Sequence, residues 1–110
     1  MTVAIARVTF FLGESHSLKE KRMVLRRIKD RVANKFNCAI AEVGDQDNWQ
    51  SAELGFAVVS NEHGFTQSMV QKILTFIEDL AVAKVIDDEQ DYITYGDEVG
   101  GEPSHWEPPK

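Results

Sequence analysis

Eight of the twelve basic residues lie within "SLKEKRMVLRRIKDRVANK", residues 17 to 35. They are Lys19, Lys21, Arg22, Arg26, Arg27, Lys29, Arg31 and Lys35. Basic side chains along one element can neutralise successive phosphates, and the counterions released give salt-dependent affinity. The segment therefore predicts a nucleic-acid-binding surface in which Lys19, Lys21 and Lys35 extend a patch made by the other five. The chain as a whole carries a net charge of -6, so the molecule is strongly polarised.

Two other interpretations of this basic segment stay open. It could be a solvated helix face, or one paired within the protein by "DDEQD" at residues 87 to 91 and by an acidic tail. It could also bind an acidic protein. RNA is the leading partner, because several phosphate contacts together would explain the clustering.

The residues that could support catalysis or metal binding are isolated from one another. His16, His63 and His105 are far apart in the sequence, and Cys38 is the only cysteine. The carboxylates within residues 87 to 91 lack the glycine and the ligand spacing of a calcium loop. We therefore expect no catalytic residue, no metal site and no small-molecule cofactor.

The segment "GDQDNWQ", residues 44 to 50, is a polar loop around one indole. Its candidate residues are Asp45, Gln46, Asp47, Trp49 and Gln50. Loops held by a rigid sheet often bind ligands. A structural role is favoured here, with Asp and Asn capping the turn and Trp49 fixing the loop to the core.

Hydrophobic periodicity predicts the elements that position these residues. Residues 3 to 12 alternate as a strand, and Ala4, Ala6, Val8, Phe10 and Leu12 share one face. The opposite face carries Val3, Ile5, Arg7 and Phe11, a candidate interface.

A helix is predicted to begin at Ser17, because Ser17 and Glu20 have the spacing of a capping box. Its core-facing stripe contains Leu18, Leu25, Ile28, Val32 and Phe36. Strands are predicted over residues 37–43 and 52–60, a second helix over 62–80, and a final strand within 83–95.

This order predicts an α+β, ferredoxin-like βαββαβ fold, with a four-stranded antiparallel sheet and two helices on one face. Residues 1–95 would form a single domain. Residues 96–110 would form a flexible acidic tail that contains Gly and Pro. The uncovered sheet face could hold a partner protein or a second copy of the chain.

Three stretches carry a resemblance to a known family: "SLKEKR" at 17–22, "AEVGDQDNWQSAELG" at 41–55 and "AVVSN" at 57–61. They resemble the YlxP-like family of small bacterial proteins of unknown function, over roughly residues 3–90. The resemblance implies a ferredoxin-like fold and no established activity. Members are commonly encoded beside translation-initiation and ribosome-maturation genes, which favours RNA or a ribosomal particle as partner.

We therefore expect a non-enzymatic binding protein that associates with RNA or the ribosome through its basic first helix. The alternative is a protein-interaction or homodimerisation module that uses the open sheet face. A cytoplasmic location is expected, because one cysteine cannot form an internal disulfide and no signal peptide or membrane-spanning run is evident.

Overall fold

The computed structural model describes residues 1–13 and 15–96. The elements follow in the order β1 (Thr2–Phe11), α1 (Leu18–Lys35), β2 (Ala39–Gly44), β3 (Ser51–Ser60), α2 (His63–Leu80) and β4 (Lys84–Thr94). Each lies where the hydrophobic pattern predicts it, with boundaries that differ by one or two residues. The tail predicted over 96–110 lies outside the described residues, apart from Gly96.

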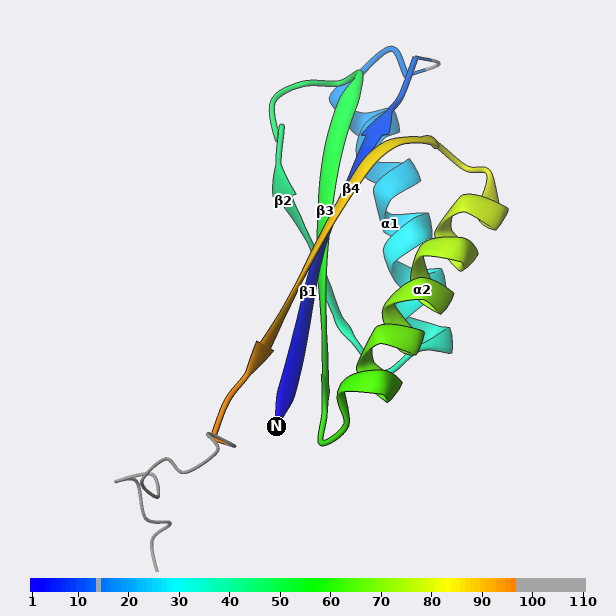
Figure 1. Cartoon of the computed structure of the whole chain (residues 1–110). Helices are drawn as coiled ribbons and strands as arrows, with labels where there is room; N and C mark the ends of the chain where they lie inside the picture. The colour runs from blue at the N-terminus through cyan, green and yellow to red at the C-terminus, as the bar shows by residue number, and fades with distance from the viewer. Residues whose placement is uncertain (14, 97–110) are drawn as a thin grey trace, which may run out of the picture.

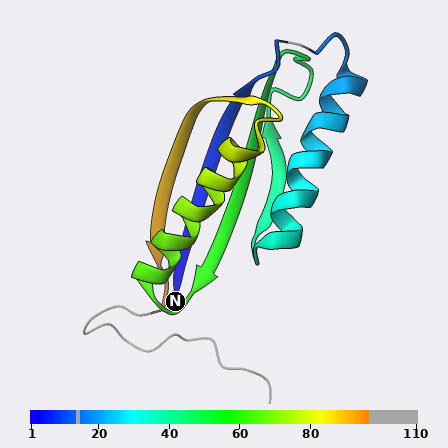
Figure 2. The same cartoon turned by 90° about the vertical axis from the view of Figure 1, so that its right-hand side faces the viewer.

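The four strands form one sheet in the order β2-β3-β1-β4, and all neighbouring pairs are antiparallel. Both helices pack on the same side of this sheet (Figure 1). Seen from the helix side, α1 lies toward β2 and α2 lies toward β4 (Figure 2). This is the predicted ferredoxin-like arrangement, and it leaves the other sheet face open.

The first turn of α1 is fixed by side-chain caps. The Ser17 hydroxyl accepts a hydrogen bond from the Glu20 N–H at 3.2 Å. The Glu20 carboxylate in turn accepts from the His16 N–H at 2.7 Å, one residue before the cap. Both bonds satisfy backbone groups that the helix leaves unpaired, so the predicted start of the helix is confirmed.

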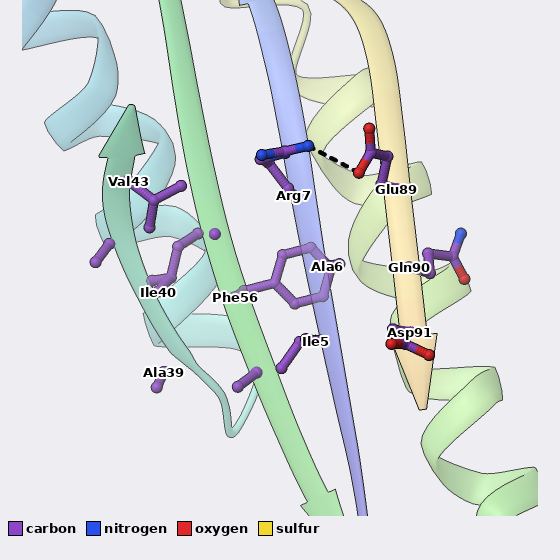
Figure 3. A pocket seen from close by; sticks show the side chains of 13 residues that line it. Ile5, Ala6, Arg7, Ala39, Ile40, Val43, Phe56, Glu89, Gln90 and Asp91 are labelled. Carbon is purple, nitrogen blue, oxygen red and sulfur yellow. Dashed lines mark hydrogen bonds and ion pairs between the residues drawn. The ribbon is translucent and has the colours of Figure 1, made fainter. Parts of the chain in front are cut away.

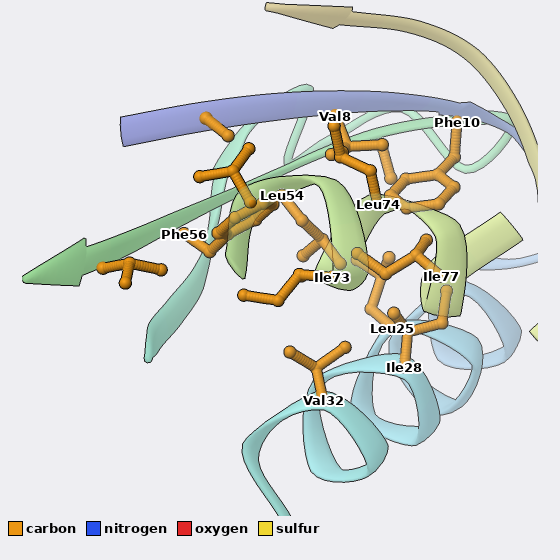
Figure 4. Close-up of a cluster of buried hydrophobic side chains, with 14 of the residues drawn as sticks. Val8, Phe10, Leu25, Ile28, Val32, Leu54, Phe56, Ile73, Leu74 and Ile77 are labelled. Atoms are coloured by element: carbon orange, nitrogen blue, oxygen red, sulfur yellow. The ribbon is translucent and has the colours of Figure 1, made fainter. Parts of the chain in front are cut away.

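The core lies between the sheet and the two helices (Figure 4). Val8 and Phe10 of β1 and Leu54 of β3 point toward the helices, where they meet Ile28 of α1 and Ile73 of α2. Phe56 also faces this core, because it shares the strand face of Leu54. Burial of the helix-facing side of β1 and β3 fixes the register of these two central strands, since a shift by one residue would expose that side.

Candidate nucleic-acid interface

The outer side of α1 carries the exposed cations of the basic segment. Six of the eight predicted residues are exposed, Lys29 is partly exposed, and only Lys21 is buried. We call these seven accessible residues the basic surface: Lys19, Arg22, Arg26, Arg27, Lys29, Arg31 and Lys35.

The basic surface has two flanks. Lys35 lies on the flank next to α2, because its Nζ is 4.7 Å from the ring centroid of Phe76. Arg27 and Arg31 precede Lys35 by two turns and one turn, so they share this flank. The other flank, toward the β2 edge, carries a row at helical spacing: Lys19, Arg22, Arg26 and Lys29.

Most cations of the basic surface have no partner among the described residues. Lys35 makes its contacts with aromatic rings, and no hydrogen bond, ion pair or ring contact involves the other six. Arg7 on β1 provides a contrast, since its guanidinium is 2.8 Å from the Glu89 carboxylate. The charge of α1 is therefore available to an external anion.

The acidic segment that could have neutralised α1 lies elsewhere. Residues 87–91 belong to β4, at one edge of the sheet, whereas α1 lies toward β2 at the other edge. Pairing of the basic helix with "DDEQD" is therefore ruled out within the domain. The second proposed partner, the acidic tail, lies outside the described residues.

Lys21 does not belong to the basic surface, and its assignment there is wrong. Its side chain is 1% exposed and points into the protein. The Nζ donates to the carbonyl oxygens of Asp45 and Asn48, the latter at 2.7 Å, and lies 3.3 Å from the Glu42 carboxylate. An ammonium held inside the protein by two carbonyl oxygens and one carboxylate cannot reach a phosphate outside the protein.

The same lysine anchors the polar loop between β2 and β3. Asp45 adopts a left-handed conformation with φ 56°, and its carboxylate accepts from the Ser51 hydroxyl at 2.7 Å. The Gln50 N–H donates to the Asn48 side chain at 2.9 Å. These contacts give the loop a structural role, as favoured from the sequence.

Trp49 is predicted to fix this loop to the core, but the contact that holds the loop comes from Lys21. Its side chain is 45% exposed, whereas Lys21 reaches two loop carbonyls from inside the protein. Gln46 and Asp47 are exposed and make no side-chain hydrogen bond within the described chain.

The open sheet face contains the predicted interface residues. Ile5, Arg7 and Phe11 are exposed on it, and Val3 is partly exposed. The structure adds three exposed apolar residues that the sequence did not single out: Val43, Val59 and Ile93. Strand pairing would have revealed the last two, because both are register partners of Val3.

Residue types that could support chemistry remain scattered in the structure. No group of three or more His, Cys, Asp or Glu side chains within the described ranges is placed to hold a metal ion. Partial burial raises the pKa of the Cys38 thiol, which disfavours the nucleophilic thiolate. Neither of the two helices is both long and apolar enough to cross a membrane.

The fold and the basic helix define a small ferredoxin-like α+β domain with one cationic side. Among solved structures it is similar to a de novo designed protein with a ferredoxin fold, with a TM-score of 0.51, 16% identity and coverage of 98% of this chain and 99% of that one. At this identity the similarity supports the fold alone.

The family is shown by sequence. Residues 3–90 match the model of a protein family of unknown function, DUF503. The chain is also 43% identical over 76 residues to the uncharacterized protein YlxP of Bacillus subtilis (strain 168), which covers 69% of this chain and 83% of that protein. The chain therefore belongs to this YlxP-like family, as the resemblance indicated.

Proposed function

We propose that this protein acts by binding rather than by catalysis, and that it binds RNA through the basic surface of α1. The observation that supports this most is the set of six cations on α1 without a partner among the described residues. A surface that only needed solubility would gain little from one sign of charge, whereas a phosphate-binding surface requires it.

The spacing of the cations suits a nucleic-acid strand. The row from Lys19 to Lys29 extends about 15 Å along the helix axis at about 1.5 Å per residue. That length corresponds to roughly four nucleotide steps at about 3.4 Å each. Arg22 and Arg26 in the middle of this row can each give a bidentate contact to a phosphate.

The distribution of acidic residues would orient the molecule as it approaches RNA. The carboxylates of β4 lie at the sheet edge away from β2, so they repel a polyanion from that side and leave the basic surface facing it. Phosphate contacts position a protein without reading sequence. We therefore propose recognition of RNA shape with little base selectivity, and a ribosomal particle as the natural source of such RNA, in line with the gene neighbourhood of the family.

Replacement of Arg22, Arg26 and Lys29 with Gln tests this proposal. All three side chains are outside the core, so the fold should remain, and RNA affinity in fluorescence anisotropy should fall by tenfold or more. The control changes an exposed lysine of β4, at the sheet edge away from α1: Lys84→Gln. Equal affinities of the triple variant and the wild type would contradict the proposal.

A protein-interaction module is the second candidate, and the apolar open face of the sheet favours it. The two functions respond differently to salt. RNA that copurifies through phosphate contacts is lost in high salt, whereas an apolar contact survives it.

A further inference from the structure

The open face of the sheet is a shallow depression floored by small residues (Figure 3). Its floor is formed by Ala39 and Ala41 of β2 with Gly55 and Ala57 of β3. Ile5 and Arg7 of β1 border the floor on one side, and the hollow has a volume of about 750 Å³. The centre of the face is thus uncharged and concave.

Val43 lies on this face together with Ala39 and Ala41, next to an irregularity in the pairing of β2 with β3. The register shifts between Glu42 and Gly44, so Val43 lacks a paired partner in β3. Its side chain lies over Gly55, where a Cβ atom would come within 2.9 Å of Val43 Cγ1. The glycine therefore makes room for an apolar side chain that remains 54% exposed.

Exposed apolar side chains gather on this face. Of the eleven large hydrophobic residues exposed in the described part of the chain, five lie here: Ile5, Phe11, Val43, Val59 and Ile93. Charged residues flank the small-residue floor. Toward β4, Glu89 pairs with Arg7 and Asp91 lies opposite Ile5. At the other margin, Glu53 lies beside Gly44 at the end of β2. An uncharged centre with a charged margin is the composition of a protein–protein interface.

We propose that a second copy of this chain covers the open face, so that the protein is a homodimer with its two sheets packed face to face. Four strands about 4.8 Å apart and about 33 Å long give a flat footprint of roughly 600 Å². Because projecting side chains add surface to this flat footprint, the accessible area of the face approaches the roughly 800 Å² that each partner buries in a standard interface. The whole face is therefore needed, and it is large enough.

Self-complementarity supports the choice of a second copy. In a twofold contact, the projecting Ile5 of β1 in each copy can enter the small-residue floor of the other, beside its β3. The acids of β4 exclude a twofold axis perpendicular to the strands, since that axis would stack β4 on β4 and place like charges together. The axis therefore runs parallel to the strands, with β4 of each copy over Ala39, Ala41 and Val43 on the open side of β2 of the other.

Sedimentation equilibrium of the full chain tests the dimer. The wild type should have twice the mass of the 12.4 kDa chain, in 1 M NaCl as in low salt. Val43→Asp should raise the dimer dissociation constant at least about a hundredfold, because each interface would then bury two unpaired charges. Ala41→Glu, an exposed position on the floor, should do the same without loss of any apolar packing.

The control is Phe65→Asp on α2, whose side chain is 53% exposed and lies away from the open face. It should remain dimeric. Circular dichroism checks that every variant is folded. A monomeric wild type at about 100 μM, above the dissociation constant of a specific interface, would overturn the proposal. So would a folded Val43→Asp or Ala41→Glu variant that dimerises as well as Phe65→Asp.

Discussion

The outer side of α1 and the open face of the sheet lie on opposite sides of the same four strands. Most cations on the first surface are unpaired within the part of the chain that the structure describes, whereas the second surface is mainly apolar. On α1, six cations have no partner in the described chain. On the open face, Arg7 is paired with Glu89, and Lys84 lies at the β4 edge opposite Phe11. The centre of that face is apolar.

This difference indicates two kinds of binding in one small domain. Unpaired charge acts over about a Debye length and is weakened by salt. Apolar surface acts at contact and depends little on salt. A substitution on one surface should therefore weaken binding at that surface and leave binding at the other surface unchanged.

The largest effect concerns Lys21, which lies on neither surface. Lys21→Met would leave the Glu42 carboxylate without its ion-pair partner, and the carbonyls of Asp45 and Asn48 without their donor. The free energy of unfolding should fall by about 3–5 kcal/mol, measured by urea denaturation.

Lys19→Met is the matched control, because Lys19 is exposed two residues earlier in the same helix. Its effect should stay within about 0.5 kcal/mol. Adding Glu42→Leu to Lys21→Met should restore part of the lost stability, since it removes the orphaned charge. A single Lys21→Met variant as stable as the wild type would show that this lysine does not hold the loop.

The second prediction is that RNA affinity and dimer formation change independently. The triple variant with Gln at positions 22, 26 and 29 should lose RNA affinity by about tenfold or more and keep the dimer mass. Val43→Asp should lose the dimer and keep its affinity for a short RNA within about twofold, because additivity holds for distant sites. Loss of both properties in either variant would show that the surfaces form one site.

The fold was predictable because its elements repeat at clear periods. Alternation placed the buried face of β1, and Ser17 with Glu20 marked the start of α1. Element boundaries differed at β2, where the strand begins at Ala39 rather than residue 37. The Cys38 N–H donates to the Phe36 carbonyl there, so a turn replaces the first two predicted strand residues.

The site was predictable only in part, and Lys21 shows why. Lys21, Leu25, Ile28 and Val32 follow one another at spacings of four, three and four residues, so all four lie on the buried stripe. This spacing indicates that Lys21 is buried, but a lysine is expected at the surface unless its acceptors are known. Those acceptors are backbone carbonyls of the loop after β2, which no sequence pattern specifies.

Val43 illustrates a second limit. Simple alternation along β2 places it on the open face with Ala39 and Ala41. The space above Gly55 that holds its side chain depends on the pairing of β2 with β3, including the irregularity beside Gly44, which is a tertiary feature.

A small effect is expected from the charge pair on the open face. Arg7 and Glu89 are both about half exposed, at 49% and 62%, so their ion pair should contribute less than about 1 kcal/mol. Arg7→Gln should therefore lower stability by no more than that in urea denaturation. A Val43→Asp background removes any coupling to dimer formation. A larger loss that persists in 1 M NaCl would show that the pair is not governed by solvent screening.

The smallest effect concerns Cys38, where burial raises the thiol pKa above its usual 9.0. At pH 8 the folded protein should react with iodoacetamide more slowly than the chain in urea, because less thiolate is present. The protonated thiol favours the folded state below the unfolded pKa, and this contribution is lost as pH rises through the folded pKa. Faster reaction in the folded state would indicate an activated cysteine.

The salt dependence of RNA binding tests the central claim most directly. With a structured ribosomal RNA fragment, fluorescence anisotropy of the wild type from low to moderate salt should give a slope of log affinity against log salt of about -3 to -4, since four or five phosphates would be contacted. The triple Gln variant should flatten that slope by about two to three units. No binding at low salt, or an equally steep slope in the triple variant, would contradict a phosphate-binding role for α1.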